Sequence, residues 1–401
     1  MTTTEPPLTA TDPTSAAATG AGSDATVERG HPAGPRTRRG LPPLPLKRLF
    51  LLALLASVLT ATAVMIDVNR FGGNPLSLIQ PGGDGPSAAV VAKDFPKTEF
   101  PPGLGFDGQM FYAAARQPMH LAKVAPDLDR PQYRLQRPLL PVLAWALHPQ
   151  GGGLGLVMAL FFVGFATLIV GGMSMGAISA TLGGKTWPAF LFPLLPGSYV
   201  CLRTSVADAL GVALALLAIA LALRSRWGLA VMAAVAAVLG KEVAVILLIG
   251  MALWRRDRRW ALLAAAPIVA AAAWWVALHL ILPDGGGRVN EIVVPFTGLA
   301  RSVRRWADHR ELSGMAAVVT TVVLAGVALV RRGLRHPFAP AIVLHLAFTT
   351  VLGVDVIANN LSGTRSTLAL LSCTILAFAI PSRPPVDAGE GRDATVATVT
   401  A

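Results

Sequence analysis

The chain has 401 residues, of which 53% are hydrophobic and only 14% are charged. This composition excludes an ordinary soluble domain, in which about 25% of residues are charged. A net charge of +12 would suit a nucleic-acid partner in a soluble protein, but here Lys and Arg form short clusters at the ends of apolar runs. Such clusters are typical of the cytoplasmic loops of membrane proteins, so we expect no nucleic-acid partner.

The chain begins with a polar tail. Residues 1–45 are rich in Thr, Ala, Pro and Gly, and this composition predicts disorder. The first apolar run starts near Leu49, too late for a signal peptide. Basic residues without an intervening acid precede it and predict a cytoplasmic N-terminus: Arg36, Arg38, Arg39, Lys47 and Arg48. Residues 382–401 form a second polar tail, which we also expect to be disordered and cytoplasmic.

Residues 46–381 indicate one polytopic membrane domain. A helix of roughly 20 apolar residues crosses the hydrocarbon core and satisfies its own backbone hydrogen bonds. The longer apolar runs predict spans at Leu49–Ile66, Leu154–Thr181, Trp187–Leu202, Val206–Leu223, Trp260–Leu282, Ser313–Val330, Pro337–Ile357 and Ser366–Ile380. The predicted fold is therefore an all-α integral membrane protein with about 9–11 transmembrane or half-membrane helices.

Two apolar runs do not fit a simple span. Pro138–His148 is short and predicts an interfacial or half-buried helix. Basic clusters flank Trp227–Trp254 on both sides, so a single span would place one of them outside. A hairpin broken at residues 240–242 keeps both in the cytoplasm, and we favour it over the single span.

A long external loop, residues 67–137, follows the first predicted span. Its Gly and Pro content up to Gly105 predicts irregular structure, and Gln109–Lys123 predicts a surface helix. Residues 283–312 and a polar turn at Ala358–Arg365 also fall on the outer side. This topology places both termini in the cytoplasm and any active site on the outer face of the plasma membrane.

Asp107 is the first candidate for chemistry in this loop. A carboxylate at the membrane surface can act as a general base on a hydroxyl, or hold a divalent metal beside a phosphate. The alternative is an Asp that caps the helix beginning near Gln109. Tyr133, Arg134 and Arg137 come just before the short apolar helix. Arginine pairs bidentately with phosphate, although anchoring at lipid head groups explains these residues equally well.

Further candidates lie at the membrane. Lys241 and Glu242 stand inside an apolar run, where each charge costs at least roughly 2.5–3.5 kcal/mol, so they are either functional or a mutually neutralised pair. Asp208 begins a span, and a structural ion pair with Arg203 explains it as well as a function does. Arg365 is a second phosphate-binding candidate, or an ordinary interfacial arginine.

Five segments carry a family resemblance, beginning with FDGQMFYAAARQP and YRLQRPLLPVLAWAL. Their order resembles that in the polytopic GT-C glycosyltransferases, which use polyprenyl-phosphate sugars, and these two segments look like parts of GPI-type and bacterial mannosyltransferases. RTSVADALGVALALLAIAL, LGKEVAVILL and NNLSGTRSTLALL are similar to later segments of that family. The resemblance covers roughly residues 49–381.

The resemblance implies a GT-C-like fold and transfer of a sugar, most often mannose, from a lipid-linked donor. Asp107 would then be catalytic, with Asp67 as the alternative acid. The substrate or its phosphate would be bound by a further set of residues: Gln109, Tyr112, Tyr133, Arg134, Arg137, Asp208, Lys241, Glu242 and Arg365. No cofactor is certain. Many members of the family carry two acids close together in the first loop, whereas here Asp107 is followed by Gly, so metal dependence stays open. A divalent cation, Mg²⁺ or Mn²⁺, would bind at Asp107 if it binds at all.

Two other functions stay open at this stage. A transporter or lipid flippase would explain the intramembrane charges of Lys241 and Glu242, although we find no inverted repeat. A scaffold subunit of envelope biogenesis would tolerate Asp107→Asn. The sugar is not defined by the sequence, and the acceptor could be a glycan, a lipid or a protein.

Overall fold

The computed structural model describes residues 43–70, 72–282, 292–309 and 311–382. The elements in these ranges belong to one compact unit, Leu41–Ala401, and all of them are helices. One isolated bridge pairs Ile292 with Leu352 within the described ranges. The all-α prediction is therefore confirmed, whereas the predicted tails at 1–45 and 382–401 lie almost entirely outside the described residues.

Four helices are long and apolar enough to cross a membrane. They are α1 (Leu46–Arg70), α7 (Gly153–Thr181), α13 (Arg258–Ile281) and α15 (Leu312–Arg332). A fifth span arises if α18 (Asn360–Ser366) and α19 (Leu368–Ala379), bent by 46°, cross as one. These helices support a multi-pass membrane protein. Three shorter apolar helices also form. α10 (Asp208–Leu223) and α16 (Ala339–Val351) lie within predicted spans, and α11 (Trp227–Gly240) lies within the predicted hairpin.

Three predicted elements have a different form in the structure. The run 187–202 forms two helices, α8 (Pro188–Leu194) and α9 (Pro196–Arg203), because Pro196 favours the extended backbone that Leu195 adopts. The run 337–357 likewise ends α16 early and continues as α17 (Val354–Ile357). The predicted turn at 358–365 is mostly helix α18, which Asn359 caps by accepting from two backbone N–H groups.

The broken run after α10 folds back on itself, as the hairpin prediction requires. α11 is followed by a 3-10 turn, η3 (Glu242–Ala244), and by α12 (Val245–Arg255). At the start of α11 the Trp227 ring centroid lies 5.7 Å from that of Trp260 in α13. At the end of α12 the Arg255 guanidinium lies 5.9 Å from the same Trp260 ring. Both ends of the hairpin therefore meet the start of α13, as a single straight span could not.

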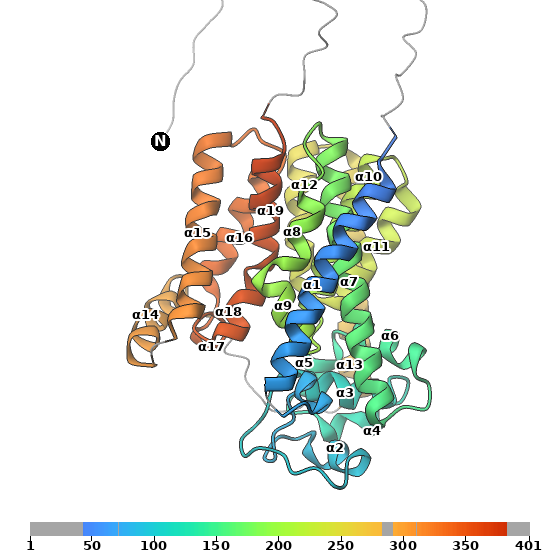
Figure 1. Ribbon diagram of the computed structural model, residues 1–401. Coiled ribbons are helices and arrows are strands. Elements are labelled where there is room, and N and C mark those ends of the chain that lie inside the picture. The colour runs from blue at the N-terminus through green and yellow to red at the C-terminus, as the bar shows by residue number, and fades with distance from the viewer. Residues whose placement is uncertain (1–42, 71, 283–291, 310, 383–401) are drawn as a thin grey trace, which may run out of the picture. The chain divides into compact units, whose positions relative to one another are not determined.

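The loop between α1 and α7 is built of short helices that gather at one end of the bundle (Figure 1). They are η1 (Pro75–Leu78), α2 (Ala88–Asp94), α3 (Asp107–Arg116), α4 (Leu121–Val124), η2 (Ala125–Asp127), α5 (Pro131–Leu135) and α6 (Leu139–Leu147). The predicted helix 109–123 is thus two helices, α3 and α4. The short α6 was predicted.

A helix that the sequence did not predict, α14 (Thr297–His309), follows α13. Its Trp306 indole is buried and donates to the carbonyl oxygen of Ala358 at 2.9 Å. Trp306 joins Leu352 and Ile357 in a small apolar cluster separate from the main core. This cluster attaches α14 to α17.

Packing of α12 on α16 depends on Gly250. A Cβ at this position would lie 2.4 Å from the Cα atom of Ala341, so we expect Gly250→Ala to lower the free energy of unfolding by about 1–3 kcal/mol. Gly228 in α11 has no neighbouring atom within 4 Å of the same position. Gly228→Ala is the matched control and should be neutral, or stabilise by up to about 1 kcal/mol. Thermal unfolding in detergent measures both, and equal effects of the two substitutions would contradict the packing.

Candidate functional site

Asp107 lies between two arginines that come from distant parts of the chain. Its Oδ1 accepts from Arg134 Nη1 at 2.8 Å, and its Oδ2 lies 2.6 Å from Arg365 Nη2. α5 and α18 thus meet at the start of α3. The capping interpretation is wrong, because the N-cap of α3 is Phe106 and no side chain caps this helix. Figure 1 shows α3, α5 and α18 at the same end of the bundle.

The two arginines keep Asp107 ionised. Burial alone would raise the pKa of this carboxyl group, but Arg365 and Arg134 outweigh that effect and hold the pKa well below its ordinary value. The carboxylate is only 17% exposed. With both oxygens engaged by guanidinium groups, it is a weak base in this arrangement.

Asp129 is a neighbouring acid that the sequence analysis missed. Its two oxygens accept from Nε and Nη2 of Arg134 at 2.8 and 2.9 Å. Burial opposes ionisation of Asp129, but the hydrogen bonds and the charge of Arg134 lower its pKa. Arg134 is therefore held from two sides, by Asp107 and Asp129. The run DLDRPQYR, in which two acids precede two arginines, could have indicated an ion pair between Asp129 and Arg134.

Asp208 is the second acid of the site. It is buried at the start of α10, 3.2 Å from Lys241 Nζ and 3.8 Å from Arg365 Nη1. Arg365 therefore bridges Asp107 and Asp208. The alternative of an ion pair between Arg203 and Asp208 is wrong, because Arg203 pairs with Asp67 instead.

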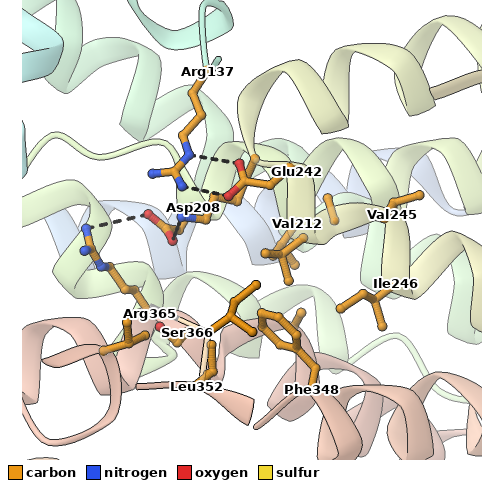
Figure 2. A pocket seen from close by; sticks show the side chains of 16 residues that line it. Arg137, Asp208, Val212, Glu242, Val245, Ile246, Phe348, Leu352, Arg365 and Ser366 are labelled. Carbon is orange, nitrogen blue, oxygen red and sulfur yellow. Dashed lines mark hydrogen bonds and ion pairs between the residues drawn. The ribbon is translucent and has the colours of Figure 1, made fainter. Parts of the chain in front are cut away.

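Glu242 forms the third charged contact. Both of its oxygens accept from Arg137, from Nε at 2.9 Å and from Nη2 at 2.7 Å. The same Nη2 donates to the Tyr133 hydroxyl at 2.8 Å. Figure 2 shows Arg137 facing Glu242, with Arg365 facing Asp208. Lys241 thus pairs with Asp208 of α10, and Glu242 with Arg137 in the link between α5 and α6.

The Tyr133 ring supports the arginines of the loop. The guanidinium carbon atoms of Arg130 and Arg137 each lie 4.5 Å from its centroid, and that of Arg134 lies 5.5 Å away. A cation over an aromatic ring is stabilised by roughly 0.5–2 kcal/mol. The ring therefore helps to collect three positive charges at one place.

Two cavities meet at these charges. The polar cavity, of about 300 Å³, is lined by Asp107, Arg130, Tyr133, Arg134, Asp208, Lys241, Asp355, Val356, Ser362, Arg365 and Ser366. The apolar cavity, of about 270 Å³, shares five of these residues: Asp208, Lys241, Val356, Arg365 and Ser366. It continues between apolar side chains such as Val212, Ile246 and Phe348 (Figure 2). Charged groups at such a junction suit an amphiphile with an anionic head group.

Three candidates from the sequence do not line either cavity. Asp67 pairs with Arg203 at 2.7 Å. Gln109 is fully buried, and its side-chain amide binds the carbonyl oxygen of Leu104. The Tyr112 hydroxyl donates to Asp94. Burial raises the pKa of Tyr112, and this hydrogen bond raises it further. Gln109 and Tyr112 order the first loop around α3, whereas Asp67 ties the end of α1 to α9.

Besides Val356, four polar residues of the polar cavity were not among the predicted site residues: Arg130, Asp355, Ser362 and Ser366. Ser362 and Ser366 come from the segment NNLSGTRS, which was noted for Arg365 alone. In a helix, residues three and four positions apart lie on the same face, so a helical interpretation of that segment would have found both.

The described residues do not fit a divalent cation. No group of three or more His, Cys, Asp or Glu side chains gathers within them. Both oxygens of Asp107 contact arginine, and Arg365 occupies the space between Asp107 and Asp208. A metal at Asp107 would have to displace that guanidinium, so we derive no step through a metal.

Comparisons with known proteins found no match among protein families, curated proteins or solved structures. Function must be inferred from the cavities and their charged residues.

The pair of Arg137 and Glu242 should be coupled energetically. We expect Arg137→Met or Glu242→Gln alone to lower the free energy of unfolding by about 2 kcal/mol, because each leaves a charged partner without its counter-charge. The double variant should lose less than the sum, by about 0.5–3 kcal/mol. Chemical unfolding in detergent completes the cycle, and additive losses would show that the pair does not interact.

The arginines around Asp107 also predict a pH dependence of stability. Because the pKa of Asp107 is lower in the folded state than its ordinary value of 3.8, the unfolded chain binds a proton first as the pH falls. The stabilisation is present at neutral pH and is lost as the pH drops below about 4. Asp107→Asn should show a shallower loss of stability between about pH 5 and pH 2. The control Glu99→Gln, an exposed acid on the same loop, should keep the wild-type slope, and identical slopes in all three proteins would contradict the assignment.

Proposed function

We propose that the chain is a membrane glycosyltransferase that moves a sugar from a polyprenyl-phosphate donor to an acceptor on the outer face of the plasma membrane. The observation that supports this proposal is the junction of the polar and apolar cavities at Asp208, Lys241 and Arg365. A lipid-linked sugar has the matching form, with a hydrocarbon chain, a phosphate and a polar sugar in sequence.

The donor would lie across this junction. Its chain would enter the apolar cavity between α10, α12 and α16, where Val212, Ile246 and Phe348 line the wall. Its phosphate would meet Lys241 and Arg365, and its sugar would extend into the polar cavity toward Asp107. Guanidinium groups bind phosphate oxygens bidentately, which suits Arg365 and Arg134.

Donor binding would also prepare Asp107 as the base. In the unliganded site Arg134 and Arg365 both contact its carboxylate. A phosphate competes for the same guanidinium groups, and when it engages them the pKa of Asp107 rises toward its ordinary value. A carboxylate with a higher pKa accepts a proton more readily. The base would therefore become effective only with the donor in place.

The reaction is a single displacement. Asp107 takes the proton of the acceptor hydroxyl, and the acceptor oxygen bonds to the anomeric carbon. The bond from that carbon to the phosphate oxygen breaks, and the polyprenyl phosphate leaves with inversion at the anomeric centre. Lys241 and Arg365 stabilise the charge that develops on the leaving phosphate. Removing one such donor in other enzymes costs roughly 10²–10³ in rate.

The resemblance to GT-C mannosyltransferases is the basis for proposing this class of enzyme, and it suggests mannose as the sugar. The long apolar helices support a multi-pass protein, and the distribution of Lys and Arg would place both termini in the cytoplasm. The acceptor belongs to the cell envelope and is a glycan, a lipid or a protein.

The decisive assay is transfer of radiolabelled mannose from polyprenyl-phosphate mannose to endogenous acceptors in membranes. Asp107→Asn should lower transfer at least about 100-fold, because the base is lost. Asp67→Asn at matched expression should transfer close to the wild-type level, since Asp67 does not line the cavities.

Equal transfer by wild type and Asp107→Asn would contradict the role of Asp107. Loss in Asp67→Asn alone would move the base to the end of α1. No transfer by wild type with mannose or with a panel of other lipid-linked sugars would contradict the enzyme itself and favour a transporter.

A further inference from the structure

A third cavity lies between α13 and the hairpin that α11, η3 and α12 form. This α13 cavity has a volume of about 330 Å³, within the range of roughly 300–1,000 Å³ typical of ligand sites. The residues that line it come from the end of α5 and from α11, η3, α12 and α13: Gln136, Val238, Glu242, Val245, Ile268, Ala271, Ala272 and Trp275. Apart from Gln136 and Glu242, its walls are apolar.

The hairpin tip separates the α13 cavity from the apolar cavity. Glu242 and Val245 line both. The consecutive residues Gln136 and Arg137 line opposite ones, Gln136 the α13 cavity and Arg137 the apolar cavity. The side chain of Glu242 is 40% exposed despite its ion pair with Arg137. Glu242 therefore lies between the apolar cavity and the α13 cavity and lines both.

The α13 cavity borders the lipid phase. α13 is one of the four helices long enough to span a membrane, and its Ile268 and Trp275 are 46% and 52% exposed. Exposed apolar side chains of a spanning helix face lipid. Toward the loop, α13 is fixed by the Trp274 indole, which donates to the carbonyl oxygen of Leu135 at 2.9 Å. A hydrocarbon chain can therefore enter from the bilayer, along the face that carries Ala271 and Ala272.

Charge distinguishes this cavity from the donor site. Its described lining holds one carboxylate and one amide, with neither Lys nor Arg. Such a lining repels a phosphate and suits a neutral head group with hydroxyls, which can donate to Glu242 and hydrogen bond with Gln136. The apolar cavity has the opposite character, since Arg137, Lys241 and Arg365 line it.

We propose that the α13 cavity binds the hydrocarbon chain of the acceptor, so that the acceptor is a lipid-linked alcohol or a neutral glycolipid. This inference rests on the proposed function. The acceptor hydroxyl group approaches Glu242 from one side of the hairpin tip while the donor phosphate approaches from the other. Arg137 connects Glu242 to Tyr133, and Tyr133 lines the polar cavity with Asp107. The α13 cavity shares Glu242 and Val245 with the apolar cavity and no lining residue with the polar cavity, so the acceptor hydroxyl would reach Asp107 by passing Glu242, Arg137 and Tyr133.

Photocrosslinking tests the occupant without requiring catalysis. The probe is a long-chain alkyl mannoside with a diazirine on its chain, added to membranes that contain the full-length protein. Mass spectrometry should find the label on α11 and α13 at the lining residues. Ala271→Leu, which fills the cavity, should lower the label there at least about tenfold, a change equivalent to about 1.4 kcal/mol. Ala273→Leu, on an exposed neighbouring position of the same helix that does not line the cavity, should leave the labelling unchanged.

Transfer kinetics supply the second readout. Ala271→Leu should raise KM for a long-chain mannoside acceptor at least about tenfold and leave KM for methyl mannoside unchanged. Ala273→Leu should change neither. Equal rises for both acceptors, or labelling that is insensitive to Ala271→Leu, would overturn the proposal.

The two proposals fail separately. If the probe labels the α13 cavity of the wild-type protein but the protein transfers no sugar, the glycosyltransferase assignment fails while the lipid site stands. If wild type transfers sugar equally well to long-chain and methyl mannosides and is not labelled there, the enzyme stands and the acceptor site is refuted.

Discussion

The site depends on one guanidinium group. Arg365 lies 2.6 Å from Asp107 and 3.8 Å from Asp208, and so joins the starts of α3, α10 and the helix that carries it. Two carboxylates this close would repel one another and favour protonation if no cation lay between them. Arg365 contacts both carboxylates, and it thereby holds the first loop against the membrane helices. The remaining charges, on Lys241 and Arg134, extend this arrangement on either side.

Sequence patterns predicted the helices better than their ends. The long apolar runs at α1, α7, α13 and α15 were found because each is uniformly apolar over roughly 20 residues. The hairpin was found because positive charges on both flanks resist translocation. Breaks inside the runs 187–202 and 337–357 were missed, since hydropathy averages over a window and does not register a local extended backbone. α14 was missed because a search for long apolar runs passes over a helix of low mean hydropathy, although its apolar residues Leu299, Val303 and Trp306 recur at helical spacing.

Pairing within the site could be predicted only in part. Asp107, Arg134, Arg137, Lys241 and Arg365 were singled out because charges next to apolar runs are costly. Which acid meets which base depends on how distant helices pack, and no local pattern contains that information. Arg203 illustrates the point: only five positions from Asp208, it turns instead to Asp67, 136 positions away. Asp129 escaped notice for the opposite reason, since it looked like an ordinary loop acid.

The chain order of the charged partners has a consequence for biosynthesis. Arg137 and Asp208 precede the hairpin tip, so Lys241 and Glu242 find their counter-charges already synthesised when they enter the membrane. Arg365 comes from α18, so the bridge between Asp107 and Asp208 forms late, after each acid has already met Arg134 or Lys241. N-terminal parts of a chain generally fold first. A chain that ends before α18 therefore keeps the pairs of Asp107 with Arg134 and of Asp208 with Lys241, but lacks the guanidinium group that joins the two acids and holds the first loop against α10.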